Sequence, residues 1–311
     1  MAVSPLAMRD GVNASCVALP NVGNGQTVLA FLRQRFPNVA AEVWLARMQA
    51  GEVVDERGMA VRAGDVLAER LGLHVFYYRE VPNETAIPFQ ATVIYEDEHL
   101  LVADKPHFLP VMPAGEYLQQ TLLVRLRREY DLPELTPLHR IDRETAGLVM
   151  FAKQERVRGV YQALFRERHI HKHYEAIAPW RAEYRYPLTH ASRLQECGDF
   201  FRMGEAAGEI NSQTVVDVIE HNTAWARYAL SPISGKRHQL RVHMAALGMP
   251  LLYDSLYPHK RPVNVGDYAQ PLQLLAKSMH FIDPISQQER EFVSQRQLLP
   301  LPAADFQDVW A

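Results

Sequence analysis

The chain has 311 residues and a formal net charge of −3, and 48% of its residues are hydrophobic. That length suits one large domain, or a large domain and a small one, around an apolar core. No stretch approaches the ~20 apolar residues that span a bilayer, and no charged start precedes an apolar run, so we expect neither a membrane anchor nor a signal peptide. The two cysteines, Cys16 and Cys197, offer no zinc-binding spacing and no disulfide framework, which favours a reduced, cytoplasmic location.

The first 90 residues predict a lead-in, a small module and a linker. Residues 1–23 lack hydrophobic periodicity and are predicted to be a flexible lead-in. A helix with Thr27 as its N-cap, a second helix from about Ala40 to Gln49 and a short hairpin then make up an α+β module, residues 24–80. Residues 81–90 contain two prolines and are predicted to be a linker.

Residues 91–311 are predicted to form an α+β domain on a largely antiparallel sheet. Strands are predicted where apolar residues alternate or form short runs, and helices where they recur at helical spacing. The predicted strands are residues 93–95, 100–103, 147–152, 171–178, 214–219 and 224–230, and the predicted helices are residues 119–130, 154–168 and 239–247.

Charge is unevenly distributed along the chain, although its total does not indicate a nucleic-acid-binding protein. Residues 125–175 contain eleven Lys/Arg and eight Asp/Glu, and residues 231–243 add three basic residues and no acid. Residues 196–220, by contrast, contain six acids and one base. Because RNA phosphates are bound by local positive charge, this pattern is consistent with a basic cleft, and equally with ordinary variation of the surface.

The first candidate reactive group is the carboxylate of Asp142, in a loop that precedes the predicted strand 147–152. Arg140 and Arg143 flank it, and their guanidinium groups would favour its ionised form. Loops held by rigid strands often carry reactive groups. From these residues alone, a loop carboxylate that forms ordinary salt bridges is an alternative explanation.

Two later segments carry further candidates. Tyr174 lies on the predicted strand 171–178, where a phenol can stack on a base and reach a proton at its edge, or can simply be half-buried. Residues 232–243 place basic side chains at the start of a helix, which suits an anion site or a solvated basic helix. The alternate histidines at 169, 171 and 173 would share one face of a strand, but no neighbouring cysteine or acid cluster supports a metal site, so no metal is predicted.

Together the three segments resemble the signature of RluA-type pseudouridine synthases, enzymes that isomerise uridines in RNA. Residues 138–148 (LHRIDRETAGL) are similar to the family's HR[L/I]D motif, residues 171–176 (HKHYEA) to its K-x-Y-x-A strand, and residues 232–243 (PISGKRHQLRVH) to its T-G-R-x-H-Q-[I/L]-R-x-H segment. The resemblance covers roughly residues 90–295, and its segments occur in the family order. It implies a catalytic domain at residues 91–311, preceded by a module (residues 24–80) that resembles the alpha-L RNA-binding fold and has no net charge.

The resemblance implies a role for each matching residue. Asp142 acts on the ribose, as a nucleophile at C1′ or a base at C2′, while Arg241 pairs with it. Tyr174 stacks on the uracil and assists loss of the C5 proton. Lys236 stands where the family has Arg, and an ammonium cannot reproduce the two-pronged contact of a guanidinium. The RNA-binding residues implied are His139, Arg140, Lys172, Lys236, Arg237, His238 and Gln239.

The expected function is therefore isomerisation of specific uridines in ribosomal or transfer RNA, by a monomer without an obligatory protein partner. The C1′–N1 bond breaks, the base rotates and a C1′–C5 bond forms. The chain has no dinucleotide-binding, P-loop or zinc motif, in agreement with a reaction that needs no cofactor. Two alternatives stay open: an RNA-binding or assembly protein with dispensable catalysis, and a nucleoside hydrolase, which would need a second carboxylate to activate water.

Overall fold

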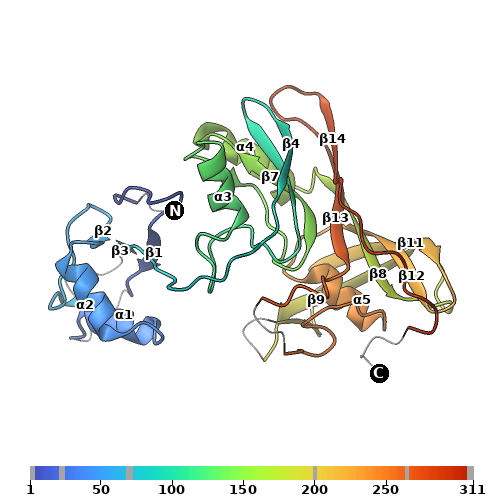
Figure 1. Cartoon of the computed structure of the whole chain (residues 1–311), viewed down its shortest axis with the longest axis horizontal. Coiled ribbons are helices and arrows are strands. Elements are labelled where there is room, and N and C mark those ends of the chain that lie inside the picture. Colours follow the sequence, from blue (N-terminus) through green and yellow to red (C-terminus); the bar gives the residue numbers. More distant parts are fainter. Residues whose placement is uncertain (1–3, 21–24, 68–72, 199–201, 263–265, 307–311) are drawn as a thin grey trace. The chain divides into compact units, whose positions relative to one another are not determined.

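The computed structural model describes residues 4–20, 25–67, 73–198, 202–262 and 266–306 (Figure 1). The chain divides into two units. One comprises Met1–Glu84 with Gly115–Gln119, and the other comprises Thr85–Ala114 with Gln120–Ala311. The domain limits drawn from the sequence, 24–80 and 91–311, stay a prediction, as does the likeness of the first unit to an alpha-L module. None of the helices in the described residues combines the length and hydropathy that a membrane span requires.

The N-terminal unit has a three-stranded sheet and two helices. Its strands are β1 (Ser15–Ala18), β2 (Val53–Asp55) and β3 (His74–Tyr77), in the order β1-β3-β2, and its helices are α1 (Val28–Arg35) and α2 (Ala41–Gln49). Thr27 caps α1 as predicted, because its hydroxyl accepts a hydrogen bond from the Ala30 N–H at 3.2 Å. Buried apolar side chains from both helices and the sheet, including Leu32, Trp44 and Val75, form the core.

The structure corrects one prediction for this unit and confirms another. Residues 15–18, within the predicted flexible lead-in, form β1 and pair with β3, which supplies hydrogen bonds that no local pattern reveals. Residues 59–61, predicted as the second strand of a hairpin, do pair with β2: the Asp55 N–H donates to the Met59 carbonyl at 2.9 Å, the Val61 N–H donates to the Val53 carbonyl at 2.8 Å, and Ala60 bridges Val54, while β3 pairs with the other edge of β2. Residues 1–3 and 21–24 of the predicted lead-in lie outside the described residues.

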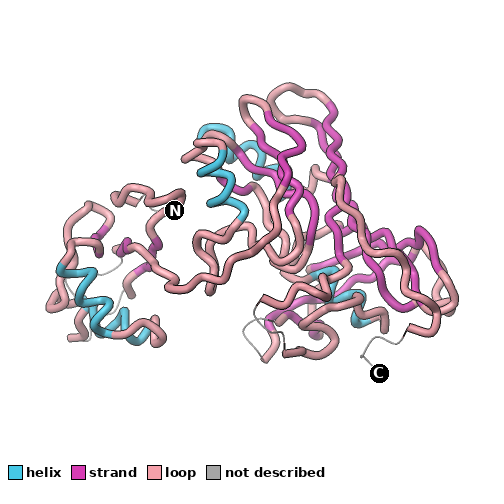
Figure 2. Tube along the Cα trace, in the orientation of Figure 1, coloured by secondary structure: helices cyan, strands magenta, loops and turns pink. Residues whose placement is uncertain are grey.

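The larger unit is built on an 11-stranded mixed sheet (Figure 2). The strand order is β10-β9-β11-β12-β8-β13-β7-β5-β4, with β14 beside β13 and β6 beside β7. Within the described residues, the strand pairs of this sheet are antiparallel except for β13 with β7, which confirms the predicted α+β class. The strands are β4 (Thr92–Glu96), β5 (Leu100–Lys105), β6 (Thr136–Pro137), β7 (Ala146–Ala152), β8 (His171–Pro179), β9 (Leu188–Glu196), β10 (Met203–Ala206), β11 (Ser212–His221), β12 (Trp225–Pro232), β13 (Leu274–Ile282) and β14 (Glu289–Val293), and the helices are α3 (Leu122–Glu129), α4 (Glu155–Arg166) and α5 (Gln239–Ala246).

Among the apolar cores along this sheet, two lie under helices. Helix α4 packs on the half that contains β5 and β7, where Tyr161 and Met150 are fully buried. Helix α5 packs on the half that contains β11 and β12, where Tyr228 and Met244 are fully buried. Strands β8 and β13 join the two halves, so loops that end beside these strands face the junction.

Gly147 fixes the approach of the Asp142 loop to this junction. It follows the loop at the start of β7 and has φ 109°, a conformation that L residues avoid. A Cβ atom built at this position would lie 2.3 Å from the backbone oxygen of Ala276 in the parallel neighbour β13. Only glycine lets the two backbones approach this closely, which seats the loop against β13.

Candidate active site

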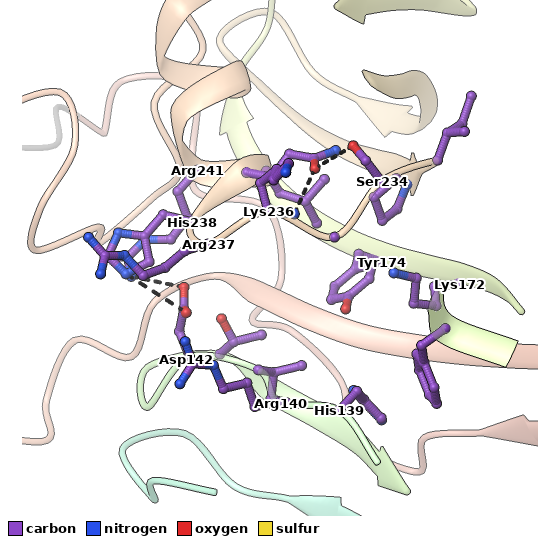
Figure 3. Close-up of a pocket in the computed structure, with 18 of the residues that line it drawn as sticks. His139, Arg140, Asp142, Lys172, Tyr174, Ser234, Lys236, Arg237, His238 and Arg241 are labelled. Atoms are coloured by element: carbon purple, nitrogen blue, oxygen red, sulfur yellow. Dashed lines mark hydrogen bonds and ion pairs between the residues drawn. The ribbon is translucent and has the colours of Figure 1, made fainter. Parts of the chain in front are cut away.

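A cavity of about 700 Å³ lies at the junction of the two halves of the larger unit (Figure 3). Three segments that are distant in the sequence line it: the loop before β7, the start of β8, and the loop that leads from β12 into α5. They bring the side chains of Asp142, Tyr174 and Arg241 into one site. Figure 3 shows Asp142 on one wall and Tyr174 on β8 across from it.

The cavity wall is strongly basic. Among the described residues that line it, Asp142 is the one carboxylate. Its side chain faces the cavity and is 27% exposed. A concave wall of this composition attracts a polyanion, in line with the uneven charge of the sequence. Its seven cationic side chains are Arg140, Arg166, Arg168, Lys172, Lys236, Arg237 and Arg241.

The guanidinium of Arg241 is surrounded by three carboxylates although only 2% of its side chain is exposed. Its Nε and Nη2 atoms donate to Asp254 at 2.8 and 2.6 Å, Nη2 also donates to Glu144 at 2.8 Å, and Nη1 donates to Asp142 at 3.3 Å. Burial by itself would lower the pKa of this guanidinium, but the adjacent carboxylates, Asp254 foremost, raise the pKa above its usual value. Arg241 is therefore a permanently charged group with a fixed direction toward Asp142.

The buried Lys105 and the half-buried His107 hold the backbone of the Asp142 loop. The ammonium of Lys105, at the end of β5, donates to the carbonyl oxygens of Arg143 at 3.1 Å and Pro106 at 2.9 Å. The imidazole of His107 lies 2.7 Å from the carbonyl oxygen of Glu144. Burial lowers the pKa of Lys105 well below its usual range and that of His107 to about 4. These contacts fix the loop without using Asp142 itself.

Strand β8 supplies Tyr174 and Lys172. Burial, followed by the charge of Asp142, raises the pKa of the Tyr174 phenol, so the hydroxyl stays protonated at neutral pH. Burial lowers the pKa of Lys172, and within the described residues its ammonium has no hydrogen-bond or ion-pair partner. A Cβ atom built on Gly235 would lie 3.6 Å from this ammonium, which places Lys172 beside the loop after β12.

His238 lies on the other side of Asp142. Its Nδ1 is 2.9 Å from the hydroxyl of Tyr257, which itself accepts a hydrogen bond from the Met203 N–H at 2.8 Å. Its Nε2 is 3.8 Å from Oδ1 of Asp142. Burial, only partly opposed by the charge of Asp142, lowers the pKa of His238 and keeps the ring neutral.

Gln239 is buried and its amide is engaged on both sides. Its oxygen accepts from the Ser234 hydroxyl at 2.7 Å and the Lys236 N–H at 3.1 Å, while its nitrogen donates to the Gln213 carbonyl and the Thr214 hydroxyl, both at 2.9 Å. These bonds shape the loop that presents Lys236 to the cavity. We therefore interpret Gln239 as a support of this loop and not as a ligand.

The remaining predicted residues differ in their surroundings. His139 stacks on Phe165, with ring centroids 4.6 Å apart, and its Nε2 accepts from the Met150 N–H at 3.1 Å. Burial lowers the pKa of His139 to about 3, so this ring is a neutral part of the wall. Arg140 is exposed at the cavity, and Arg237 forms an ion pair with Glu196 at 3.1 Å.

Glu144 and Asp254 are functional residues that the motif comparison alone does not single out. Glu144 lies within the matched segment 138–148 and Asp254 lies outside the three matched segments, and neither carboxylate can be told from a solvated one until its partner is known. The partner is Arg241, and Glu144 is further fixed by the hydroxyl of Ser255, which donates to it at 2.5 Å. A buried arginine in the middle of an amphipathic helix, which must find counter-charges, is the signal that predicts such residues.

One group of side chains has the composition of a metal site. Ligand atoms of His190, Glu205 and His243 lie within 4.8 Å of one another, whereas two donors of one tetrahedral zinc ion lie about 3.4 Å apart. His190 is already 2.7 Å from Glu205, and the Nε2 atom of His243 is 3.0 Å from the Ser212 hydroxyl. We interpret the group as a hydrogen-bonded cluster under α5 and assign no metal to it.

Comparisons with known proteins identify the family of this chain. Residues 99–246 match the family model described as RNA pseudouridylate synthase. The dual-specificity RNA pseudouridine synthase RluA of Vibrio cholerae is 32% identical over 204 residues, which are 62% of this chain and 78% of that protein, and the RluA protein of Pasteurella multocida is 31% identical over 64% of this chain and 90% of its own length. The chain belongs to the RluA-type pseudouridine synthase family. It is thus an enzyme of the class that isomerises uridine in RNA.

The fold of this pseudouridine synthase is shared with a solved structure. Human RNA Pseudouridylate Synthase Domain Containing 1 superimposes with a TM-score of 0.57 at 21% identity, over 71% of this chain and 91% of that one. At this identity the likeness concerns the fold alone. It agrees with the mixed sheet described above.

Proposed function

We propose that this pseudouridine synthase acts on a uridine of ribosomal or transfer RNA, with Asp142, Tyr174 and Arg241 as its catalytic residues. The pairing of Asp142 with Arg241 in a cation-lined cavity is the observation that carries the proposal. The Vibrio cholerae ribosomal large subunit pseudouridine synthase C is 28% identical over 86% of this chain and 88% of its own length, and the RluA proteins are named dual-specificity. Their names do not choose between the two RNA classes.

In the proposed reaction the target uridine leaves the helix and enters the cavity, because its sugar cannot be reached inside a stack. The Asp142 carboxylate attacks C1′, and N1 departs with the bonding electrons; alternatively, Asp142 removes a proton from C2′. The uracil rotates and C5 bonds to C1′, which breaks the Asp142–C1′ bond; in the alternative route, where N1 departs as the C2′ proton is removed, that proton returns to C2′ as C5 bonds. The C5 proton is then lost and N1 gains a proton. Arg241 holds Asp142 in place throughout, since its other nitrogens are fixed by Asp254 and Glu144.

The remaining wall residues position the RNA. Tyr174 stacks on the uracil, and its neutral hydroxyl contacts the base edge where the C5 proton is lost. The unpaired ammonium of Lys172 and the exposed Lys236 bind phosphate or a uracil oxygen. Arg140, exposed two residues before Asp142, occupies the space that the flipped base leaves. Lys236, Arg237 and His238 enter the cavity from the loop that Gln239 supports.

A hydrolase is the second candidate, and the geometry argues against it. The second carboxylate that would activate water is Glu144, but its two oxygens bind Arg241 and Ser255, and the residue is 9% exposed. Release of free uracil from RNA by the purified protein would support hydrolysis.

We propose that the enzyme is a cytoplasmic monomer.

Pseudouridine mapping in total RNA with and without this gene tests the proposal. One or a few sites in ribosomal or transfer RNA should lack pseudouridine in the deletion strain. Wild-type protein should restore them, and Asp142→Asn should not. An unchanged pseudouridine map in the deletion strain would remove the proposed substrate class. Restoration of every site by Asp142→Asn would remove the catalytic assignment.

A further inference from the structure

Helix α4 ends at a position whose backbone favours glycine but which carries an arginine. The His169 N–H donates to the Leu164 carbonyl at 2.8 Å, a Schellman closure, and Arg168 between them has φ 62°. Glycine is the usual residue there, since a Cβ atom strains the left-handed backbone. The fold would be served better by glycine, so a reason for arginine at 168 must lie elsewhere.

The side chain of Arg168 supplies that reason. It is exposed, it lines the cavity, and within the described residues it has no ion-pair or hydrogen-bond partner. Arg166, on the last turn of α4, also lines the cavity but already pairs with Glu167 at 2.9 Å. Arg168 is therefore a cation held at the cavity at the expense of local backbone strain.

Two exposed isoleucines line the same cavity. Ile210 precedes β11 and is 62% exposed, and Ile233 follows β12 and is 43% exposed. Thr214 of β11 lies opposite Pro232 of β12, so both isoleucines extend beyond the same end of the sheet. Large apolar side chains left open beside seven cations suit a ligand with both an anionic and an apolar part. A nucleotide of single-stranded RNA has both, as a phosphate and a base face.

We propose that Arg168, Ile210 and Ile233 form a second RNA subsite, which holds a nucleotide next to the target uridine. Arg168 pairs with its phosphate, and the isoleucines pack against its base. This inference rests on the proposed function, because a flipped uridine leaves its neighbours unstacked and in need of new contacts. The subsite selects RNA segments in which the neighbour of the target is not base-paired.

Arg168→Gly tests the phosphate contact and separates it from a structural role. The variant should melt at the wild-type temperature or above it, because glycine relieves the strain. On a transcript that spans the mapped uridine, KM should rise about five- to tenfold with kcat unchanged, and the slope of log affinity against log salt should become shallower by about 0.7. Arg158→Ala, an exposed arginine of α4 outside the cavity lining, is the matched control and should change neither quantity.

The base contact is tested with transcripts that lack the base on one side or the other of the target. On one of these abasic transcripts, kcat/KM of the wild-type enzyme should fall about five- to tenfold. The double variant Ile210→Ser/Ile233→Ser should show a fall of the same size on intact RNA. On that abasic transcript the double variant should show no further fall, because the base that the isoleucines contact is already missing. Ile219→Ser, an equally open isoleucine of β11 outside the cavity, is the control.

Two results would overturn the subsite while the proposed function stands. One is an Arg168→Gly variant whose KM and salt dependence equal those of the wild type. The other is a double isoleucine variant whose loss of kcat/KM multiplies with the loss caused by the missing base. Failure of the wild-type enzyme to form pseudouridine in any RNA would overturn both.

Discussion

Arg241 reaches Asp142 at 3.3 Å across 99 positions of the sequence, while its bonds to Asp254 are shorter, at 2.6 and 2.8 Å. The guanidinium is thus anchored by Asp254 and Glu144, and it offers its remaining nitrogen to the reactive carboxylate. Asp142 gains a charged partner without being enclosed, since 27% of its side chain still faces the cavity. A carboxylate that must act on a ribose needs this combination of orientation and access.

Asp254→Asn should weaken both the fold and the reaction. It leaves a buried guanidinium with fewer counter-charges, so the free energy of unfolding should fall by about 3 kcal/mol or more. Turnover should fall at least tenfold because Arg241 loses its fixed direction. Denaturant titration and single-turnover assays measure the two effects. Glu155→Gln, which breaks an exposed pair with Arg158 at 3.0 Å, should cost less than ~1 kcal/mol and leave turnover unchanged. Equal stability of Asp254→Asn and wild type would show that Arg241 does not depend on Asp254.

Tyr174→Phe should keep RNA binding and lose turnover. The variant keeps a ring that stacks but removes a hydroxyl whose raised pKa holds it protonated beside Asp142. We expect kcat to fall by about 100-fold or more with KM within about twofold of wild type. Tyr174→Leu should raise KM as well, because it also removes the ring. Wild-type turnover in Tyr174→Phe would limit Tyr174 to stacking.

Lys236→Ala should weaken RNA binding at every sequence alike, because an exposed ammonium contacts phosphate. KM should rise severalfold, kcat should not change, and the slope of log affinity against log salt should become shallower by about 0.7 to 0.9. Lys236→Arg restores the residue that is common in the family and should bind at least as tightly as wild type. Loss of kcat in Lys236→Arg would assign this residue to the reaction and not to phosphate.

Acid should destabilise the larger unit through His243. Burial lowers the pKa of this fully buried ring to about 4, whereas an unfolded histidine has a pKa of ~6.5. Between these values the unfolded chain binds the proton and the folded chain does not, so the free energy of unfolding falls as pH falls from 6.5 to 4. This group contributes up to about 1.4 kcal/mol per pH unit. In His243→Asn, the free energy of unfolding, measured by denaturant titration, should change less steeply with pH, by up to about 1.4 kcal/mol per pH unit. An unchanged slope would show that His243 does not cause the loss of stability in acid.

The sequence predicted the parts of the fold that have strong local patterns. The helices near α3, α4 and α5 and the buried strand β7 were all visible as periodicity or as apolar runs. Strand β14 (EREFV) was not, because its charged side chains face solvent and only Phe292 is buried. Strand β9 was missed for a similar reason, since most of its side chains are exposed or half-buried and its pairing with β11 defines it.

The candidate site was predictable as a set of residues but not as a geometry. The motifs identified Asp142, Tyr174 and Arg241. The roles of Glu144 and Asp254, which fix the Arg241 guanidinium, follow only from contacts that the fold makes. The same holds for Gln239, whose polar side chain suggests a ligand of RNA until its four internal hydrogen bonds are seen. Arg168 carried no motif, and its position at the cavity follows only from how α4 ends.

The central claim is that Asp142, held by Arg241 in a basic cavity, isomerises uridine in RNA. Release of tritium from RNA labelled at C5 of uridine measures that step directly with the purified protein. We predict stoichiometric release at the mapped uridine by wild-type enzyme and none above background by Asp142→Asn, although both bind the transcript equally. Tritium release by Asp142→Asn at the wild-type rate would contradict the account.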